Sequence, residues 1–133
     1  MNRFLSEINT LPEALLRMVA YYRNEGSERL KAWAQKIQGR EIVIFGGMGS
    51  SELVPLAITH KLATAGLMSR TLDVGEWLHY GVKRPRKKHL VVLISQSGES
   101  IEVKKLVETG KAGIEYIAIT NIEESFLARD SDL

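Results

Sequence analysis

A short apolar run that leads into a hydroxyl-rich turn and then a helix constrains this fold more than any other feature. Residues 90–94, Leu-Val-Val-Leu-Ile, form a short continuous apolar run and predict a buried strand. The turn at residues 95–100 follows directly, and a helical pattern begins at Ile101 and ends at Gly110. A buried strand, a turn and a helix in this order predict one βα unit of a parallel sheet.

The same order of elements recurs along the chain. Further strands are predicted at residues 42–45, 69–74 and 116–120, and further helices at residues 52–65, 75–80 and 123–128. Because strands alternate with helices, we expect an α/β fold: a three-layer, flavodoxin-like, doubly wound parallel sheet with helices on both faces. The chain stops at Leu133 where another apolar strand is expected, so we also expect this sheet to lack its last strand.

Residues 2–38 are predicted to form three helices ahead of the sheet. Thr10 and Glu13 have the spacing of a capping box, and Pro12 is tolerated in a first helical turn, so a second helix is expected to begin there. Ser27 is placed to cap a third helix that carries an amphipathic stripe.

The composition excludes several classes of protein. At 133 residues the chain is one domain at most, here residues 40–133 after a helical lead-in at residues 1–39. A net charge of +2 gives no bias toward nucleic acid or membranes, and the absence of cysteine excludes disulfides and thiolate metal sites. No apolar run approaches the roughly 20 residues of a membrane span. We therefore expect a cytoplasmic protein without nucleic-acid or membrane partners, and we interpret the basic run at residues 83–89 as a solvated loop.

Two predicted turns carry the residues that point to a ligand. The carboxyl ends of parallel strands meet at one edge of a sheet, so we expect the glycine loop (residues 47–51) beside the serine loop (residues 95–100). N–H groups at a helix start and serine hydroxyls are donors for phosphate oxygens. The serine loop therefore predicts a site for a phosphate monoester on a small polyol. The glycine loop alone is equally typical of a tight βα turn with a serine N-cap, because it lacks both the dinucleotide and the nucleoside-triphosphate fingerprints.

The motif Ser-Gln-Ser-Gly-Glu-Ser after a Val-Val-Leu-Ile strand, with Gly-Ser-Ser after the first strand, resembles the sugar isomerase (SIS) domain. The resemblance covers essentially the whole chain and is greatest to the isomerase half of glutamine–fructose-6-phosphate aminotransferase. It implies that residues 40–133 are a first, C-terminally incomplete SIS domain whose ligand is a phosphorylated hexose or amino sugar. The serine loop would grip the phosphate, and the hydroxyls of the glycine loop would lie near the sugar. The implied binding residues are Gly49, Ser50, Ser51, Ser95, Gln96, Ser97 and Ser100.

The resemblance leaves the activity open. In the aminotransferase relatives the catalytic glutamate, histidine and lysines come from the second half of a two-SIS protein, so no residue of this chain is predicted to be catalytic. One hypothesis is the N-terminal part of a sugar-phosphate isomerase, aminotransferase or amino-sugar deaminase. The alternative is a non-catalytic module that senses a phosphosugar. SIS proteins commonly dimerise, so a homodimer is expected.

Other chemistries find less support in the sequence. No pair of histidines has metal-ligand spacing with a carboxylate, and we expect neither a metal nor a cofactor. A flavodoxin-like or nucleotide-binding domain is a third hypothesis, which Asp73 and Glu76 keep open. Glu99 lies at a predicted helix start, where the helix dipole stabilises a carboxylate and lowers its basicity. We therefore expect Glu99 to order the loop and not to act as a base.

Overall fold

The computed structural model describes residues 3–80, 88–110 and 114–132. The chain divides into two compact units, residues 1–36 and 37–133. Most of the basic run interpreted above as a solvated loop, namely residues 83–87, lies outside the described residues.

The N-terminal unit contains a long helix, α1 (Arg3–Arg23), followed by α2 (Ser27–Ile37). The predicted break near Thr10 is wrong, because α1 continues through Pro12. The Thr10 hydroxyl donates a hydrogen bond of 3.0 Å back to the Glu7 carbonyl, so it bonds the preceding turn and does not cap a new helix. The last predicted helix does begin at Ser27.

The second unit is built on one parallel sheet. Its strands are β1 (Ile42–Gly47), β2 (Met68–Asp73), β3 (His89–Ile94) and β4 (Glu115–Ile119). They lie in the order β2-β1-β3-β4, and each neighbouring pair is parallel. This arrangement confirms the predicted α/β fold with a parallel sheet.

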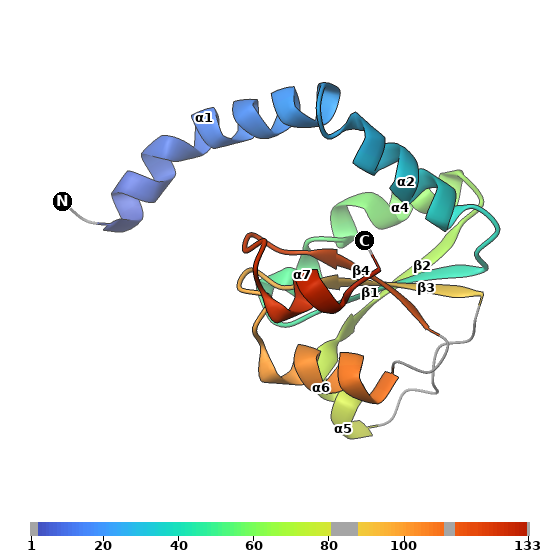
Figure 1. Ribbon diagram of the computed structural model, residues 1–133. Coiled ribbons are helices and arrows are strands. Elements are labelled where there is room, and N and C mark those ends of the chain that lie inside the picture. The colour runs from blue at the N-terminus through green and yellow to red at the C-terminus, as the bar shows by residue number, and fades with distance from the viewer. Residues whose placement is uncertain (1–2, 81–87, 111–113, 133) are drawn as a thin grey trace. The chain divides into compact units, whose positions relative to one another are not determined.

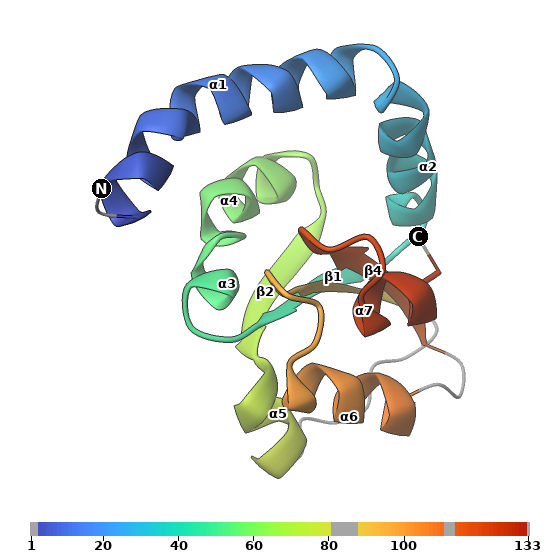
Figure 2. The same ribbon diagram turned by 60° about the vertical axis from the view of Figure 1, so that its left-hand side comes forward.

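Helices follow each strand. They are α3 (Ser50–Leu53), α4 (Leu56–Thr64), α5 (Val74–Tyr80), α6 (Ile101–Gly110) and α7 (Phe126–Asp130). Figures 1 and 2 show α4 on one face of the sheet and α5 and α6 on the other. The single helix predicted at residues 52–65 is wrong: Pro55 caps a separate α4, and the shorter α3 precedes it. Proline has no N–H to donate, so the chain restarts its helical bonding there.

The hydrophobic core lies between the central strands and the face that carries α5 and α6. β1 and β3 are buried along almost their whole length, as expected for strands covered on both faces. Val91 and Leu93 of β3 are fully buried and pack with Trp77 of α5 and Val103 of α6. Each such aliphatic side chain contributes about 1.5–3 kcal/mol on burial, so this layer holds the strand ends in place.

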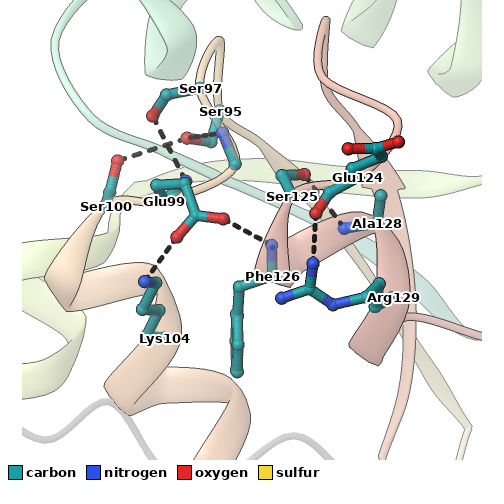
Figure 3. Close-up of polar contacts among 11 residues, drawn as sticks. Ser95, Ser97, Glu99, Ser100, Lys104, Glu124, Ser125, Phe126, Ala128 and Arg129 are labelled. Carbon is teal, nitrogen blue, oxygen red and sulfur yellow. Dashed lines mark hydrogen bonds and ion pairs between the residues drawn. The ribbon is translucent and has the colours of Figure 1, made fainter.

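The segment after α7 returns to the outer side of β4. The backbone N–H of Tyr116 donates to the Asp132 carboxylate at 2.9 Å, and the Asp132 N–H donates to the Tyr116 carbonyl at 2.9 Å. These two bonds hold the C-terminal end of α7 against the sheet. The start of α7 lies beside the loop that leaves β3, where the polar residues gather (Figure 3).

Candidate functional site

The glycine loop and the serine loop leave neighbouring strands at the same edge of the sheet. β1 pairs directly with β3, with Gly46 opposite Leu93, so both strands end at the same level. The strand order also reverses here, because the chain proceeds from β1 to β2 on one side and from β3 to β4 on the other. Ligands of open parallel sheets bind at such a switch point. The expected grouping of the two loops is therefore present.

The glycine loop brings the start of α3 close to the end of β1. A Cβ atom on Gly47 would lie 2.5 Å from the Ser51 carbonyl carbon, so only glycine fits this approach. The N-cap of α3 is Gly49, which makes no side-chain bond, and the serine N-cap considered from the sequence is wrong. Ser50 is exposed and Ser51 half-buried, so the Ser50 hydroxyl is the more accessible donor.

The serine loop is organised by its own hydroxyls (Figure 3). Ser95 is buried, and its Oγ accepts a hydrogen bond of 3.1 Å from the Gly98 N–H and lies 3.2 Å from the Ser100 Oγ. The Ser97 Oγ accepts from the Glu99 N–H at 3.2 Å. Because an accepting hydroxyl still has its own proton to donate, the exposed Ser97 can bond a ligand oxygen outside the loop.

The loop is fastened to the segment that follows β4 and to the first turn of α7. The Gln96 carbonyl accepts from the Asn121 N–H at 3.2 Å, and the Gly98 carbonyl accepts from the Leu127 N–H at 3.1 Å. Gly98 has a φ of 65°, and a Cβ atom there would lie 2.2 Å from the Ser125 Oγ. The serine loop is thus held by hydrogen bonds at both Gln96 and Gly98, and it leads directly into α6.

Glu99 is the charged member of the serine loop, and its carboxylate turns away from Ser97 toward Lys104 and Phe126 (Figure 3). It forms an ion pair with Lys104 and accepts a hydrogen bond of 2.7 Å from the Phe126 N–H. The Lys104 ammonium and, second, the Phe126 N–H hold the pKa of Glu99 below its usual range. A carboxylate with a lowered pKa is a weak base, which agrees with the expected loop-ordering role.

The electrostatics of the loop suit an anion. The first N–H groups of α6 have no carbonyl within the helix to bond, and the positive end of the helix dipole faces the loop. Lys104 balances the charge of Glu99, so the remaining donors of the loop are neutral. Neutral donors at a helix start are a common arrangement for phosphate sites.

The described residues give less support to a nucleotide site, a metal site or a membrane-spanning helix. Asp73, at the position of a ribose acceptor, takes a hydrogen bond of 2.9 Å from the Glu76 N–H and so caps α5. Within residues 3–80, 88–110 and 114–132, no group of three or more histidine, cysteine, aspartate or glutamate side chains could hold a metal ion. None of the helices in these ranges is both long and apolar enough to cross a bilayer.

Sequence reasoning located the serine loop but missed the residues that fasten it. Ser125 is buried and caps α7 by accepting from the Ala128 N–H at 3.3 Å. Lys104 lies one turn into α6, and its ammonium is 5.6 Å from the centre of the Phe126 ring. A serine before a short helical turn is a local capping signal that could have been read, whereas the pairing of α6 with Phe126 has no local signature.

Comparisons with known proteins agree with this geometry. The family model for the SIS domain matches residues 36–133. The chain is 31% identical over 129 residues to a glutamine–fructose-6-phosphate aminotransferase of Sulfurisphaera tokodaii, covering 96% of this chain and 21% of that protein. It is 40% identical over 91 residues to an arabinose 5-phosphate isomerase of Escherichia coli, covering 68% of this chain and 28% of that protein.

A solved structure of an Escherichia coli CFT073 protein in complex with a ligand is also similar. It superposes with a TM-score of 0.73 at 27% identity, covering 100% of this chain and 73% of the other. The chain therefore spans between a fifth and a third of the length of the two curated relatives, and most of this ligand-bound one.

Proposed function

Because the chain belongs to the SIS domain family, we propose that its serine loop binds the phosphate group of a phosphorylated hexose or amino sugar. The observation that carries this proposal is the position of the serine hydroxyls at the start of α6, at the switch point of the sheet. The ligand-bound solved relative lends support, since its fold superposes over the whole chain.

The proposed binding residues have different tasks. Gln96 and Ser97 are exposed and contact the phosphate oxygens directly, together with N–H groups at the start of α6. The hydroxyls of Ser95 and Ser100 contact each other and stabilise the conformation of the loop. The half-buried Ser100 also contacts the phosphate. The sugar lies toward the glycine loop, where Gly49, Ser50 and Ser51 contact its hydroxyls; of these, Ser50 is exposed.

We further propose that the chain acts as the N-terminal part of a cytoplasmic, homodimeric sugar-phosphate isomerase, aminotransferase or deaminase. Support comes from the names of the two curated relatives, an isomerising aminotransferase and an arabinose 5-phosphate isomerase. In this proposal residues 40–133 are the first SIS domain and bind the phosphate group of the substrate. The base that moves the proton between carbons comes from outside the serine loop, because Glu99 is engaged with Lys104.

A phosphosugar sensor without catalysis is the second candidate. The engagement of Glu99 by Lys104 and the Phe126 N–H is compatible with it, since the serine loop itself then offers no free carboxylate base. The two candidates differ in turnover. Tight binding of a sugar phosphate without isomerisation, amination or deamination in the full-length protein favours the sensor, and conversion of the bound sugar favours the enzyme.

The binding proposal is tested by thermal unfolding with sugar phosphates. Fructose-6-phosphate, glucosamine-6-phosphate and arabinose 5-phosphate are compared with the unphosphorylated sugars and with inorganic phosphate. A ligand at a hundredfold excess over its Kd stabilises the folded state by about 2.7 kcal/mol, which raises the Tm measurably. We expect a shift with the phosphorylated sugars alone.

Serine variants assign the shift to the loop. Ser97→Ala removes an exposed donor of the serine loop, and Ser6→Ala, in α1 and outside both loops, is the serine-to-alanine control. We expect Ser97→Ala to weaken binding about tenfold, since a hydrogen bond to a charged ligand is lost. Because the Ser97 Oγ also accepts the Glu99 N–H, the Tm of each free variant is measured alongside its affinity. Equal affinity of the two variants would remove Ser97 from the site.

A further inference from the structure

A carboxylate beside an anion site needs an explanation. Glu99 lies within the serine loop, and Coulomb repulsion between its charge and a phosphate weakens binding unless it is offset. Yet its two carboxylate oxygens have separate partners: one accepts the Phe126 N–H at 2.7 Å, and the other pairs with Lys104. Figure 3 shows both contacts on the side of Glu99 that faces away from Ser97.

We propose that Glu99 is a positioning residue that holds the serine loop in its phosphate-binding conformation by fastening it to the start of α7. The proposal rests on the proposed function, because it assigns a role within the same site. Glu99 itself does not touch the phosphate. It acts through Ser97, whose Oγ accepts the hydrogen bond from the Glu99 N–H.

The contacts with α7 form a two-point clamp. Gly98 bonds Leu127 through its carbonyl, and the next residue, Glu99, bonds Phe126 through its carboxylate. With both contacts in place, the peptide between Gly98 and Glu99 has one orientation, and the Glu99 N–H points at Ser97. Loss of the second contact leaves the Gly98 carbonyl with the one remaining described bond to α7, so the peptide after Gly98 can turn and the Ser97 hydroxyl loses its orientation.

Lys104 makes the clamp compatible with an anion. Its ammonium pairs with Glu99 and lies 5.6 Å from the centre of the Phe126 ring, so one cation interacts with both members of the Glu99–Phe126 contact. The carboxylate is thereby balanced, and its charge does not oppose the phosphate. Lys104 begins the second turn of α6, so the balancing charge is carried by the same helix whose N-terminus faces the ligand.

Positioning and electrostatics predict opposite effects of Glu99 substitutions. If the carboxylate acted only as a charge, Glu99→Ala and Glu99→Gln would both strengthen phosphate binding, because each frees Lys104. If it positions the loop, Glu99→Ala weakens binding, whereas Glu99→Gln keeps an oxygen for the Phe126 N–H and preserves it. Glu99→Asp keeps the charge but withdraws the carboxylate by one methylene, so positioning alone predicts a loss.

The experiment measures the Kd of fructose-6-phosphate by calorimetry for the full chain and these three variants. We expect Glu99→Ala and Glu99→Asp to bind about tenfold more weakly and Glu99→Gln to bind within about twofold of the parent chain. Unchanged or tighter binding by Glu99→Ala or Glu99→Asp overturns the proposal. If Glu99→Ala fails to fold, the comparison of Glu99→Asp with Glu99→Gln still decides it.

A second measurement separates failure of this inference from failure of the proposed function. If the parent chain binds no sugar phosphate, the proposed function falls, and amide hydrogen exchange then tests the clamp without a ligand. We expect the Phe126 and Glu99 amides to exchange faster in Glu99→Ala than in Glu99→Gln, while the fully buried Val91 of β3 stays protected in both. Equal exchange of these amides in the two variants overturns the positioning role.

Discussion

The backbone of Gly98 passes so close to Ser125 that a Cβ atom on Gly98 would lie 2.2 Å from the Ser125 hydroxyl oxygen. The same Cβ would lie 2.9 Å from the Thr120 Oγ1, and the φ of Gly98 is 65°. Gly98→Ala therefore combines the strain of a left-handed backbone conformation with a steric clash between the new Cβ and the buried Ser125 hydroxyl. We expect it to cost about 2–5 kcal/mol of unfolding free energy, measured by urea denaturation.

Gly66→Ala is the control that separates these two causes. Gly66 has a φ of 77°, but a Cβ atom there would meet no described atom within 4 Å. We expect Gly66→Ala to cost about 1–2 kcal/mol, the backbone penalty alone. Equal losses of unfolding free energy in the two variants would mean that the close approach of Gly98 to Ser125 adds nothing to the cost of Gly98→Ala.

Ser125→Ala removes the cap of α7. The Ser125 Oγ accepts from the Ala128 N–H at 3.3 Å, and the side chain is buried. Loss of an N-cap typically costs about 0.5–2 kcal/mol, so we expect a Tm lowered by several degrees. Because α7 holds the serine loop through the Leu127 N–H, phosphate affinity should fall as well. An unchanged Tm in Ser125→Ala would argue against the capping role.

The stability of the fold should fall in acid partly because of Glu99. Its pKa is lowered in the folded chain by Lys104 and by the Phe126 N–H. A group of this kind stabilises the fold above its unfolded-state pKa, and the contribution is lost as the pH falls through the lower, folded-state pKa. Urea unfolding at pH values between about 6 and about 2 should therefore show a steeper loss for the parent chain than for Glu99→Gln. Parallel profiles would show that the carboxylate does not titrate differently on folding.

The extent to which the sequence predicts this structure differs between the sheet and the site. The run at residues 90–94 is buried on both faces, so its apolar pattern alone identified β3 and the turn that follows it. The capping pattern at Thr10 failed because a hydroxyl can bond either the preceding or the following turn, and only the surrounding helix decides which. A local pattern therefore predicts an element better than it predicts its ends.

The site was predictable where its residues are adjacent in sequence and not where they are distant. The serine loop is one contiguous motif, and its hydroxyls bond within six residues of one another. The contact of Glu99 with Phe126 joins positions 27 residues apart, and it depends on how α7 returns along β4. The hydrophobic periodicity of the sequence does not predict how α7 returns along β4, because that return depends on how the helices pack against the sheet.

A partly buried ion pair at the opposite edge of the sheet offers a test of stability that leaves the site untouched. Arg40, just before β1, pairs with Glu115 at the start of β4, and their side chains are 20% and 26% exposed. The pair spans β3, because β3 lies between β1 and β4 in the sheet. It therefore fastens the amino-terminal ends of three strands, away from the serine loop at their carboxyl ends.

Removing one partner should leave the other charge less well balanced. We expect Arg40→Met or Glu115→Gln to cost about 1–2 kcal/mol, between the values for exposed and buried pairs, and the double variant to cost less than the sum.

The neighbouring pair of Lys88 and Glu41 is a matched control, because its side chains are 69% and 53% exposed and screened by water. Glu41→Gln should cost less than either single variant of the Arg40–Glu115 pair. Both sets of variants should bind sugar phosphate as the parent chain does, since neither pair contacts the loops at the carboxyl edge. Weaker phosphate binding by Glu115→Gln would show that the two edges of the sheet are coupled.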